Sequence, residues 1–122
     1  MKKENVIREK SYAFAVNIVS VCRKLQRDQR EYVLSKQLLR SGTAIGANIE
    51  EAIGSYSRKE FSSKLSISYK EARETLYWIR LLRDTNTLQS DAVQQLISDT
   101  KELLRIIGSI QKTVKNSLKK PP

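Results

Sequence analysis

Apolar residues recur along this chain at steps of three, four and seven residues, the period of one face of an α-helix. The first series predicts a helix over about residues 5–27. Its members are Ile7, Phe14, Ile18, Val21, Cys22 and Leu25. A polar stretch over residues 26–31 follows and predicts a connection.

The second series predicts a helix over residues 34–53, with Ser35 as a candidate cap and Gly54 as a stop signal. Its members are Leu34, Leu38, Ile45, Ile49, Ala52 and Ile53. Gly42 and Gly46 lie in its interior, where each glycine costs on the order of 1 kcal/mol relative to alanine. Because they share a helix face, we expect a neighbouring helix to approach closely there.

The third and fourth helices are predicted over residues 58–83 and 91–116. Ser57 and Glu60 have the capping-box spacing, and Ser90 offers a cap for the last helix. The apolar positions of the two helices are Phe61, Leu65, Ser68, Ala72, Leu76, Ile79 and Leu82, then Val93, Leu96, Ile97, Leu103, Leu104, Ile107, Ile110 and Val114. The basic tail over residues 117–122 is expected to fray, because the apolar series stops and two prolines end the chain.

Four long helices with short connections place sequential helices antiparallel. The sequence therefore predicts an all-α fold, an antiparallel up-down-up-down four-helix bundle, as a single domain over residues 1–122. A domain of this length buries roughly two-thirds of the surface that its unfolded chain exposes.

Composition indicates which partners and which cellular location to expect. Lys and Arg outnumber Asp and Glu by 23 to 13, which gives a net charge of +10 and favours polyanionic partners. The single cysteine, Cys22, lies in an apolar series and is interpreted as a buried thiol. No segment is long and apolar enough to span a membrane, and residues 1–4 lead into a charged segment instead of a signal sequence. We therefore expect a cytoplasmic protein without a membrane partner.

Catalytic equipment is missing from the sequence. The chain has no histidine, which removes the commonest general base and a common metal ligand. No phosphate-binding glycine loop, dinucleotide fingerprint or Cys-x-x-Cys pair occurs. The pairs Glu50/Glu51 and Glu71/Glu74 lack the histidines that di-metal bundles use. The sequence predicts that the protein is not an enzyme and uses no cofactor or metal.

Basic residues gather in three segments, where they are candidates for binding nucleic-acid phosphates; an ordinary solvated surface is the alternative for any one of them. The first segment holds Arg23, Lys24, Arg27, Arg30 and Lys36, beside Arg40. The second holds Arg58, Lys59 and Lys64, and the third holds Lys112, Lys115, Lys119 and Lys120. Glu71 or Glu74 is expected to contact Arg40 or Asn48, as buried charges are usually paired.

The middle of the chain resembles the 23S rRNA intervening-sequence protein family, also called the four-helix bundle protein family. The resemblance rests on residues 37–52 (QLLRSGTAIGANIEEA), Phe61, Lys64, Leu65, Lys70, Glu71, Ala72, Glu74, Thr75 and residues 77–82 (YWIRLL). The polar members of this motif, interpreted as structural, are Arg40, Ser41, Asn48, Glu51, Lys70, Glu71 and Glu74.

The resemblance implies a bundle that assembles as a ring of five, encoded in sequences inserted into bacterial 23S rRNA genes or elsewhere in the chromosome. Tyr12, Tyr69, Tyr77 and Trp78 are candidate interface aromatics, with ordinary packing as the alternative. We expect a noncatalytic, nonspecific RNA- or DNA-binding homo-oligomer, with RNA ahead of DNA. The alternative hypothesis is a protein–protein interaction scaffold or accessory subunit that does not contact nucleic acid.

Overall fold

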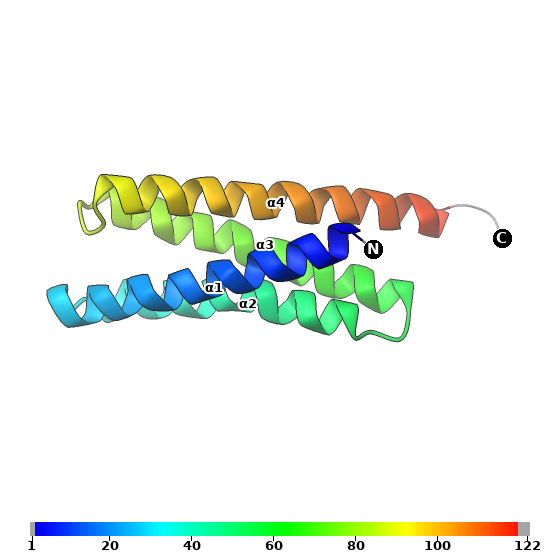
Figure 1. The fold of residues 1–122 in the computed structure, drawn as a ribbon, viewed down its shortest axis with the longest axis horizontal. Helices are drawn as coiled ribbons and strands as arrows, with labels where there is room; N and C mark the ends of the chain where they lie inside the picture. Colours follow the sequence, from blue (N-terminus) through cyan, green and yellow to red (C-terminus); the bar gives the residue numbers. More distant parts are fainter. Residues whose placement is uncertain (1, 120–122) are drawn as a thin grey trace.

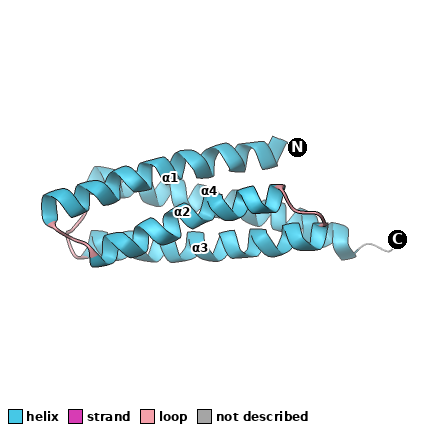
Figure 2. Ribbon diagram, turned by 90° about the horizontal axis from the view of Figure 1, so that it is seen from below, coloured by secondary structure: helices cyan, strands magenta, loops and turns pink. Residues whose placement is uncertain are grey.

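The computed structural model of the chain describes residues 2–119, without the side chains of Lys2, Ser90 and Lys119. Over that range the chain forms the helices α1 (Lys2–Gln29), α2 (Val33–Ile53), α3 (Arg58–Asp84) and α4 (Ser90–Lys119). Consecutive helices run antiparallel, and the loops are confined to the ends of the bundle (Figures 1 and 2). The predicted all-α, up-down-up-down four-helix bundle is confirmed.

The two ends of the bundle differ in what they contain. The α1–α2 and α3–α4 connections lie at one end, where the Gln29 side-chain amide donates a 2.8 Å hydrogen bond to the Thr87 carbonyl. The α2–α3 connection lies at the other end, with the start of α1 and the end of α4 (Figure 1). Packing is most extensive between α2 and α3 and least extensive between α1 and α4.

The start of α2 differs from the prediction. Ser35 does not cap this helix; it is buried in the first turn, and its hydroxyl donates to the Glu31 carbonyl at 2.6 Å. The Glu31 carboxylate takes the capping role, since it accepts hydrogen bonds from the backbone amides of Val33 and Ser35 at 3.3 and 2.8 Å. A glutamate two residues before the helix satisfies the free amides that a serine cap would have satisfied.

The cap of α3 is confirmed in its main contact. Ser57 Oγ accepts a 3.0 Å hydrogen bond from the Glu60 amide, while the Glu60 carboxylate accepts from Tyr56 N at 3.4 Å instead of from Ser57 N. The last helix is longer than predicted: it continues through Lys119 and includes residues expected to fray. No helix-breaking residue occurs before Pro121, so the local sequence permits this continuation.

One continuous core holds the four helices together. The fully buried apolar side chains of the core include Ile7, Ile18, Leu38, Ile45, Ile49, Leu65, Ile79, Leu82, Leu96, Leu103 and Ile107. Ile53 departs from the prediction, since it is 36% exposed at the last residue of α2. Cys22 is buried as predicted, and its thiol donates to the Ser35 carbonyl at 3.3 Å.

Small residues on α2 let its neighbours approach closely. A Cβ added at Gly42 would lie 2.9 Å from Ile18 Cγ2, and one added at Gly46 would lie 3.3 Å from the Ser11 carbonyl oxygen. The predicted close approach at both glycines is therefore confirmed, and α1 is the helix that makes it. On the other side of α2, the buried Ser68 hydroxyl of α3 donates to the Ile45 carbonyl at 2.8 Å.

Candidate nucleic-acid interface

The first predicted basic group lies at the end of the bundle that holds the α1–α2 connection. Arg23, Lys24 and Arg27 line a shallow pocket on the last turns of α1, with Val16, Val19 and Ser20. Arg30 adopts a left-handed backbone conformation (φ 52°) in the connection, and Lys36 follows on the first turn of α2. Arg27 Nε donates a 2.8 Å hydrogen bond to Oδ1 of its neighbour Asp28, and this hydrogen bond lowers the pKa of Asp28.

The other two predicted groups come together at the opposite end. Arg58 and Lys59 begin α3, while Lys112 and Lys115 lie near the end of α4, and all four side chains are exposed. Lys64 is not free to bind a phosphate, because it forms a 2.7 Å ion pair with Glu51 of α2. The hydrogen bond to Glu51 raises the pKa of Lys64. The candidates Lys119, by its side chain, and Lys120 lie outside the described residues.

Ion pairs cross three of the four helix interfaces. Arg8 pairs with Glu50 at 2.8 Å between α1 and α2. Arg40 pairs with Glu71 at 3.3 Å between α2 and α3, and Lys10 pairs with Glu102 at 3.3 Å between α1 and α4. Across the described part of the α3–α4 interface no ion pair forms. The outer side of that interface therefore differs in its electrostatics from the rest of the bundle.

Cations occupy both sides of the α3–α4 interface. On α3, Lys70, Arg73 and Arg80 follow at steps of three and seven and share a face. On α4, Lys101, Arg105, Lys112 and Lys115 follow at steps of four, seven and three. All seven side chains are exposed, and none of them forms an ion pair with a described residue. We call these seven residues the α3–α4 basic face.

Helix register places the two rows beside each other. The Gln111 amide donates to Ser66 Oγ at 3.3 Å, and Gly108 faces the Tyr69 ring. These two contacts fix the register of the antiparallel pair: residue 111 lies beside residue 66, and residue 108 lies beside residue 69. Seven residues further along each helix, Lys101 lies level with residue 76, between Arg73 and Arg80. In the other direction Lys115 lies level with residue 62. Arg105 lies toward the α1 edge, where it lines a shallow pocket with Lys3 and Val6.

The acidic residues within the span of this face are turned toward other helices, while Asp84 lies one helical turn beyond Arg80 and pairs with Arg83. Residues 61–80 of α3 and 101–115 of α4 contain the carboxylates of Glu71, Glu74 and Glu102. Glu71 and Glu74 contact Arg40 on α2, and Glu102 contacts Lys10 on α1. Seven positive charges thus lie on one surface without a carboxylate between them, an arrangement that self-repulsion disfavours and that a polyanion stabilises.

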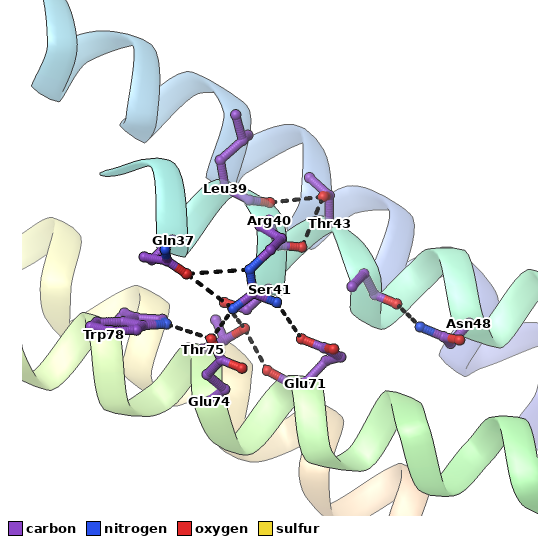
Figure 3. A network of polar contacts seen from close by, with 11 residues as sticks. Gln37, Leu39, Arg40, Ser41, Thr43, Asn48, Glu71, Glu74, Thr75 and Trp78 are labelled. Atoms are coloured by element: carbon purple, nitrogen blue, oxygen red, sulfur yellow. Dashed lines mark hydrogen bonds and ion pairs between the residues drawn. The ribbon is translucent and has the colours of Figure 1, made fainter. Parts of the chain in front are cut away.

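The polar motif in the middle of the chain forms a contact between α2 and α3 (Figure 3). The Arg40 guanidinium contacts the carboxylates of Glu71 and Glu74 and the side-chain oxygen of Gln37. Glu74 also accepts a 2.9 Å hydrogen bond from Trp78 Nε1. The Arg40 side chain is half exposed and Glu71 is 22% exposed, so this contact lies at the edge of the interface instead of in the core.

Other members of the motif have separate roles. Asn48 does not reach Arg40, Glu71 or Glu74; its side-chain amide donates to the Ala44 carbonyl of its own helix at 2.8 Å. The buried Thr75 hydroxyl lies within hydrogen-bond distance of two acceptors, Ser41 Oγ at 3.0 Å and the Glu71 carbonyl at 2.7 Å. Glu51 binds Lys64, and Lys70 belongs to the α3–α4 basic face.

The four candidate aromatics divide by exposure. Tyr69 and Trp78 are half buried and pack against the core, while Tyr12 on α1 and Tyr77 on α3 are 70% and 55% exposed. Tyr77 contacts Trp78 edge to face, with ring centroids 5.0 Å apart.

The sequence-based search missed Arg73, Arg80, Lys101 and Arg105 as members of a basic surface. Each is separated from the next cation by helical steps, so the signal was present, but it is divided between two helices and does not appear as a dense cluster in the sequence. The helical spacing of the cations within each predicted helix is the signal that indicates both rows.

The described residues contain no group of three or more His, Cys, Asp or Glu side chains that could hold a metal ion. None of the described helices combines the length and apolarity that crossing a bilayer requires.

Comparisons with known proteins agree with the bundle geometry. A family model described as 23S rRNA-intervening sequence protein matches residues 3–109. A crystal structure of a protein of unknown function from the S23 ribosomal protein family of Bacteroides thetaiotaomicron VPI-5482 superposes with a TM-score of 0.89 and is 45% identical. The match covers 90% of this chain and 98% of that chain. Among curated proteins, no match is found.

Proposed function

Since this chain belongs to the 23S rRNA intervening-sequence protein family, we propose that it is a noncatalytic protein that binds nucleic acid through the α3–α4 basic face. The observation that carries the proposal is the separation of charge: seven exposed cations on α3 and α4, with the carboxylates of Glu71, Glu74 and Glu102 turned toward α2 and α1. Phosphate contacts of this kind give sequence-independent binding. RNA is placed ahead of DNA because the family is named after sequences that interrupt 23S rRNA.

The ends of the bundle take secondary parts in this proposal. Arg58 and Lys59 extend the basic face toward the α2–α3 connection. The group formed by Arg23, Lys24, Arg30 and Lys36 lies on α1, on α2 and in their connection, outside the α3–α4 basic face. This second group serves as an internal control.

In this proposal the protein acts as a homo-oligomer, and a ring of five is the arrangement that the family resemblance implies. Tyr12 and Val16 lie one helical turn apart on α1 and are 70% and 56% exposed, while Val19 is half buried beside them. Exposed aromatic and apolar side chains on one face favour an interface between subunits. Assembly through α1 would leave α3 and α4 accessible, and several basic faces in one particle would bind one polyanion multivalently.

The test is fluorescence anisotropy with labelled single-stranded RNA, duplex RNA and duplex DNA, titrated at low and near-physiological salt. We expect salt-sensitive binding by the wild-type protein. The triple variant Arg73→Gln, Arg80→Gln, Lys101→Gln should bind at least about tenfold more weakly at near-physiological salt. The control variant Arg23→Gln, Arg30→Gln, Lys36→Gln removes the same charge from α1, α2 and their connection and should retain affinity within about threefold.

Equal losses in the two triple variants would show that net charge, and not this face, governs binding. Absence of binding by the wild-type protein at low salt would overturn the proposed function and favour the scaffold alternative. Recovery of a protein partner from nuclease-treated host lysate would then support that alternative.

A further inference from the structure

An exposed aromatic ring lies within the α3–α4 basic face. Tyr77 follows Arg73 by four residues and precedes Arg80 by three, so the three side chains share one face of α3. Lys101 of α4 lies level with residue 76, next to this tyrosine. Tyr77 is 55% exposed. An exposed aromatic ring therefore shares its face of α3 with two cations and lies near the level of a third cation on α4.

The ring is held in place by its neighbour in the sequence, Trp78. It contacts Trp78 edge to face at an interplanar angle of 75°. Trp78 donates its indole proton to Glu74, which pairs with Arg40 of α2. A ring fixed in this way loses little conformational freedom when a ligand stacks on it.

We propose that the α3–α4 basic face binds single-stranded nucleic acid, with an unpaired base stacked on Tyr77 and the flanking phosphates on Arg73, Arg80 and Lys101. The inference rests on the proposed function and makes it specific. Bases in a duplex are stacked on each other and cannot offer a face to a surface tyrosine, whereas unpaired bases stack readily on aromatic side chains.

The dimensions of the face fit a short strand. From Arg80 to the level of Lys115 the surface spans 18 residues of α3, or roughly 27 Å at 1.5 Å per residue. That length accommodates about 4–8 nucleotides, depending on how extended the strand is. The cations form two rows, one on each helix, so a single backbone can run between them.

Trp78 provides a direct reporter. It is the only tryptophan of the chain, and its ring centroid is 5.0 Å from that of Tyr77. Titration of the wild-type protein with an unstructured oligouridylate of about 12 nucleotides should change tryptophan fluorescence in step with the anisotropy of the labelled oligonucleotide. Duplex RNA of the same length should change the anisotropy with little effect on the tryptophan.

The deciding variants are Tyr77→Ala, Tyr77→Phe and Tyr32→Ala. Tyr77→Ala should weaken single-strand binding roughly 5- to 150-fold, the range that the loss of one stacked base gives. Its duplex affinity should be unchanged, and Tyr77→Phe should restore single-strand binding because the ring is kept. Tyr32 has a matched exposure of 56% beside Arg30 in the α1–α2 connection, outside the α3–α4 basic face, so Tyr32→Ala should bind as the wild-type protein does.

Each contrary outcome has a distinct meaning. Salt-sensitive binding that Tyr77→Ala leaves unchanged would overturn the stacking inference while the proposed function stands. Equal loss of single-strand and duplex affinity would also overturn it, and a loss confined to Tyr32→Ala would move stacking to the α1–α2 connection. No binding to any nucleic acid at low salt would overturn the proposed function and this inference together.

Discussion

Two glycines inside helices of this bundle, Gly42 and Gly108, differ in whether a larger residue would fit at their positions. Gly42 on α2 faces the buried Ile18 side chain so closely that a Cβ has no room. Gly108 on α4 faces the Tyr69 ring, and a Cβ added there would lie at an ordinary contact distance of 3.8 Å. Steric room, and not helix propensity, decides which glycine is needed.

The matched variants Gly42→Ala and Gly108→Ala test this difference. Gly42→Ala should lower the free energy of unfolding by about 1–3 kcal/mol, since overpacking against Ile18 outweighs the helix propensity of alanine. Gly108→Ala should raise it by about 0.5–1 kcal/mol, because alanine fits and favours the helix. Urea unfolding followed by circular dichroism measures both, and destabilisation of the same size in both variants would contradict the steric explanation.

Cys22 is the other residue whose behaviour burial determines. Desolvation raises the pKa of its thiol from 9.0 to about 11. The native protein should therefore react slowly with a thiol reagent at pH 8, and urea should accelerate the reaction strongly. Because the unfolded thiol ionises first, the contribution of Cys22 to stability is present below pH 9.0 and is lost as the pH rises toward about 11. Rapid modification of the folded protein would show that the thiol is accessible.

At the scale of helices, polar contacts at the edges fix how α2 sits on its neighbours. Glu31 positions the start of α2 through two backbone amides, and Ser68 joins α3 to the Ile45 carbonyl. Arg40 then joins α2 to two carboxylates of α3. Such contacts specify the alignment of the helices more than they stabilise the fold, since partly exposed ion pairs contribute little.

A double-mutant cycle of Arg40→Ala and Glu74→Ala tests the strength of this contact. We expect a coupling energy of about 0.5–1 kcal/mol, because the guanidinium is half exposed and screened by water. Chemical unfolding of the wild type, both single variants and the double variant gives the value. The parallel cycle with Arg27 and Asp28, adjacent residues of one helix, should give a smaller coupling and serves as the control. A coupling near zero for Arg40 and Glu74 would limit their role to the support of Trp78.

At the scale of the whole molecule, the distribution of carboxylates creates the candidate site. Ion pairs join α1 to α2, α2 to α3 and α1 to α4, and these pairs use the carboxylates that would otherwise neutralise α3 and α4. The seven cations of the α3–α4 basic face lie on one surface, where their fields add.

The salt dependence of binding counts the phosphates that this face neutralises. If all seven cations bind phosphates of a single strand, the logarithm of affinity should fall with the logarithm of salt concentration with a slope of about −5. The variant Arg73→Gln, Arg80→Gln, Lys101→Gln should reduce the slope to about −3. Anisotropy titrations at several salt concentrations give both values. An unchanged slope would remove these three residues from the interface.

The proposed homo-oligomer also belongs to the scale of the whole molecule, and its size in solution tests it. The wild-type protein should be larger than a monomer in light scattering at micromolar concentration, and Tyr12→Ser with Val16→Ser should shift it toward the monomer because exposed apolar area is lost. The control Tyr77→Ser removes a comparably exposed ring from α3 and should keep the assembly. A wild-type monomer would refute the ring.

Much of the fold follows from the sequence by itself, because the helical period of apolar residues is a local property. The series from Ile7 to Leu25 and the Ser57 cap identified helices and boundaries, and the small residues at Gly42 and Gly46 identified a close helix contact. Ser35 shows the limit of predicting caps from residue type, since Glu31, four residues earlier in the connection, caps the helix instead.

The candidate site depended on tertiary structure. Periodicity assigns Arg73 and Arg80 to one face of α3 and Lys101 to one face of α4, but only packing sets those faces side by side. Packing also separated Arg23 from Lys112 at opposite ends of the bundle, and directed Glu71 and Glu102 toward other helices. The sequence determined which side chains each helix presents; the tertiary structure decided which charges meet, because electrostatic fields depend on distances between helices that no local pattern encodes.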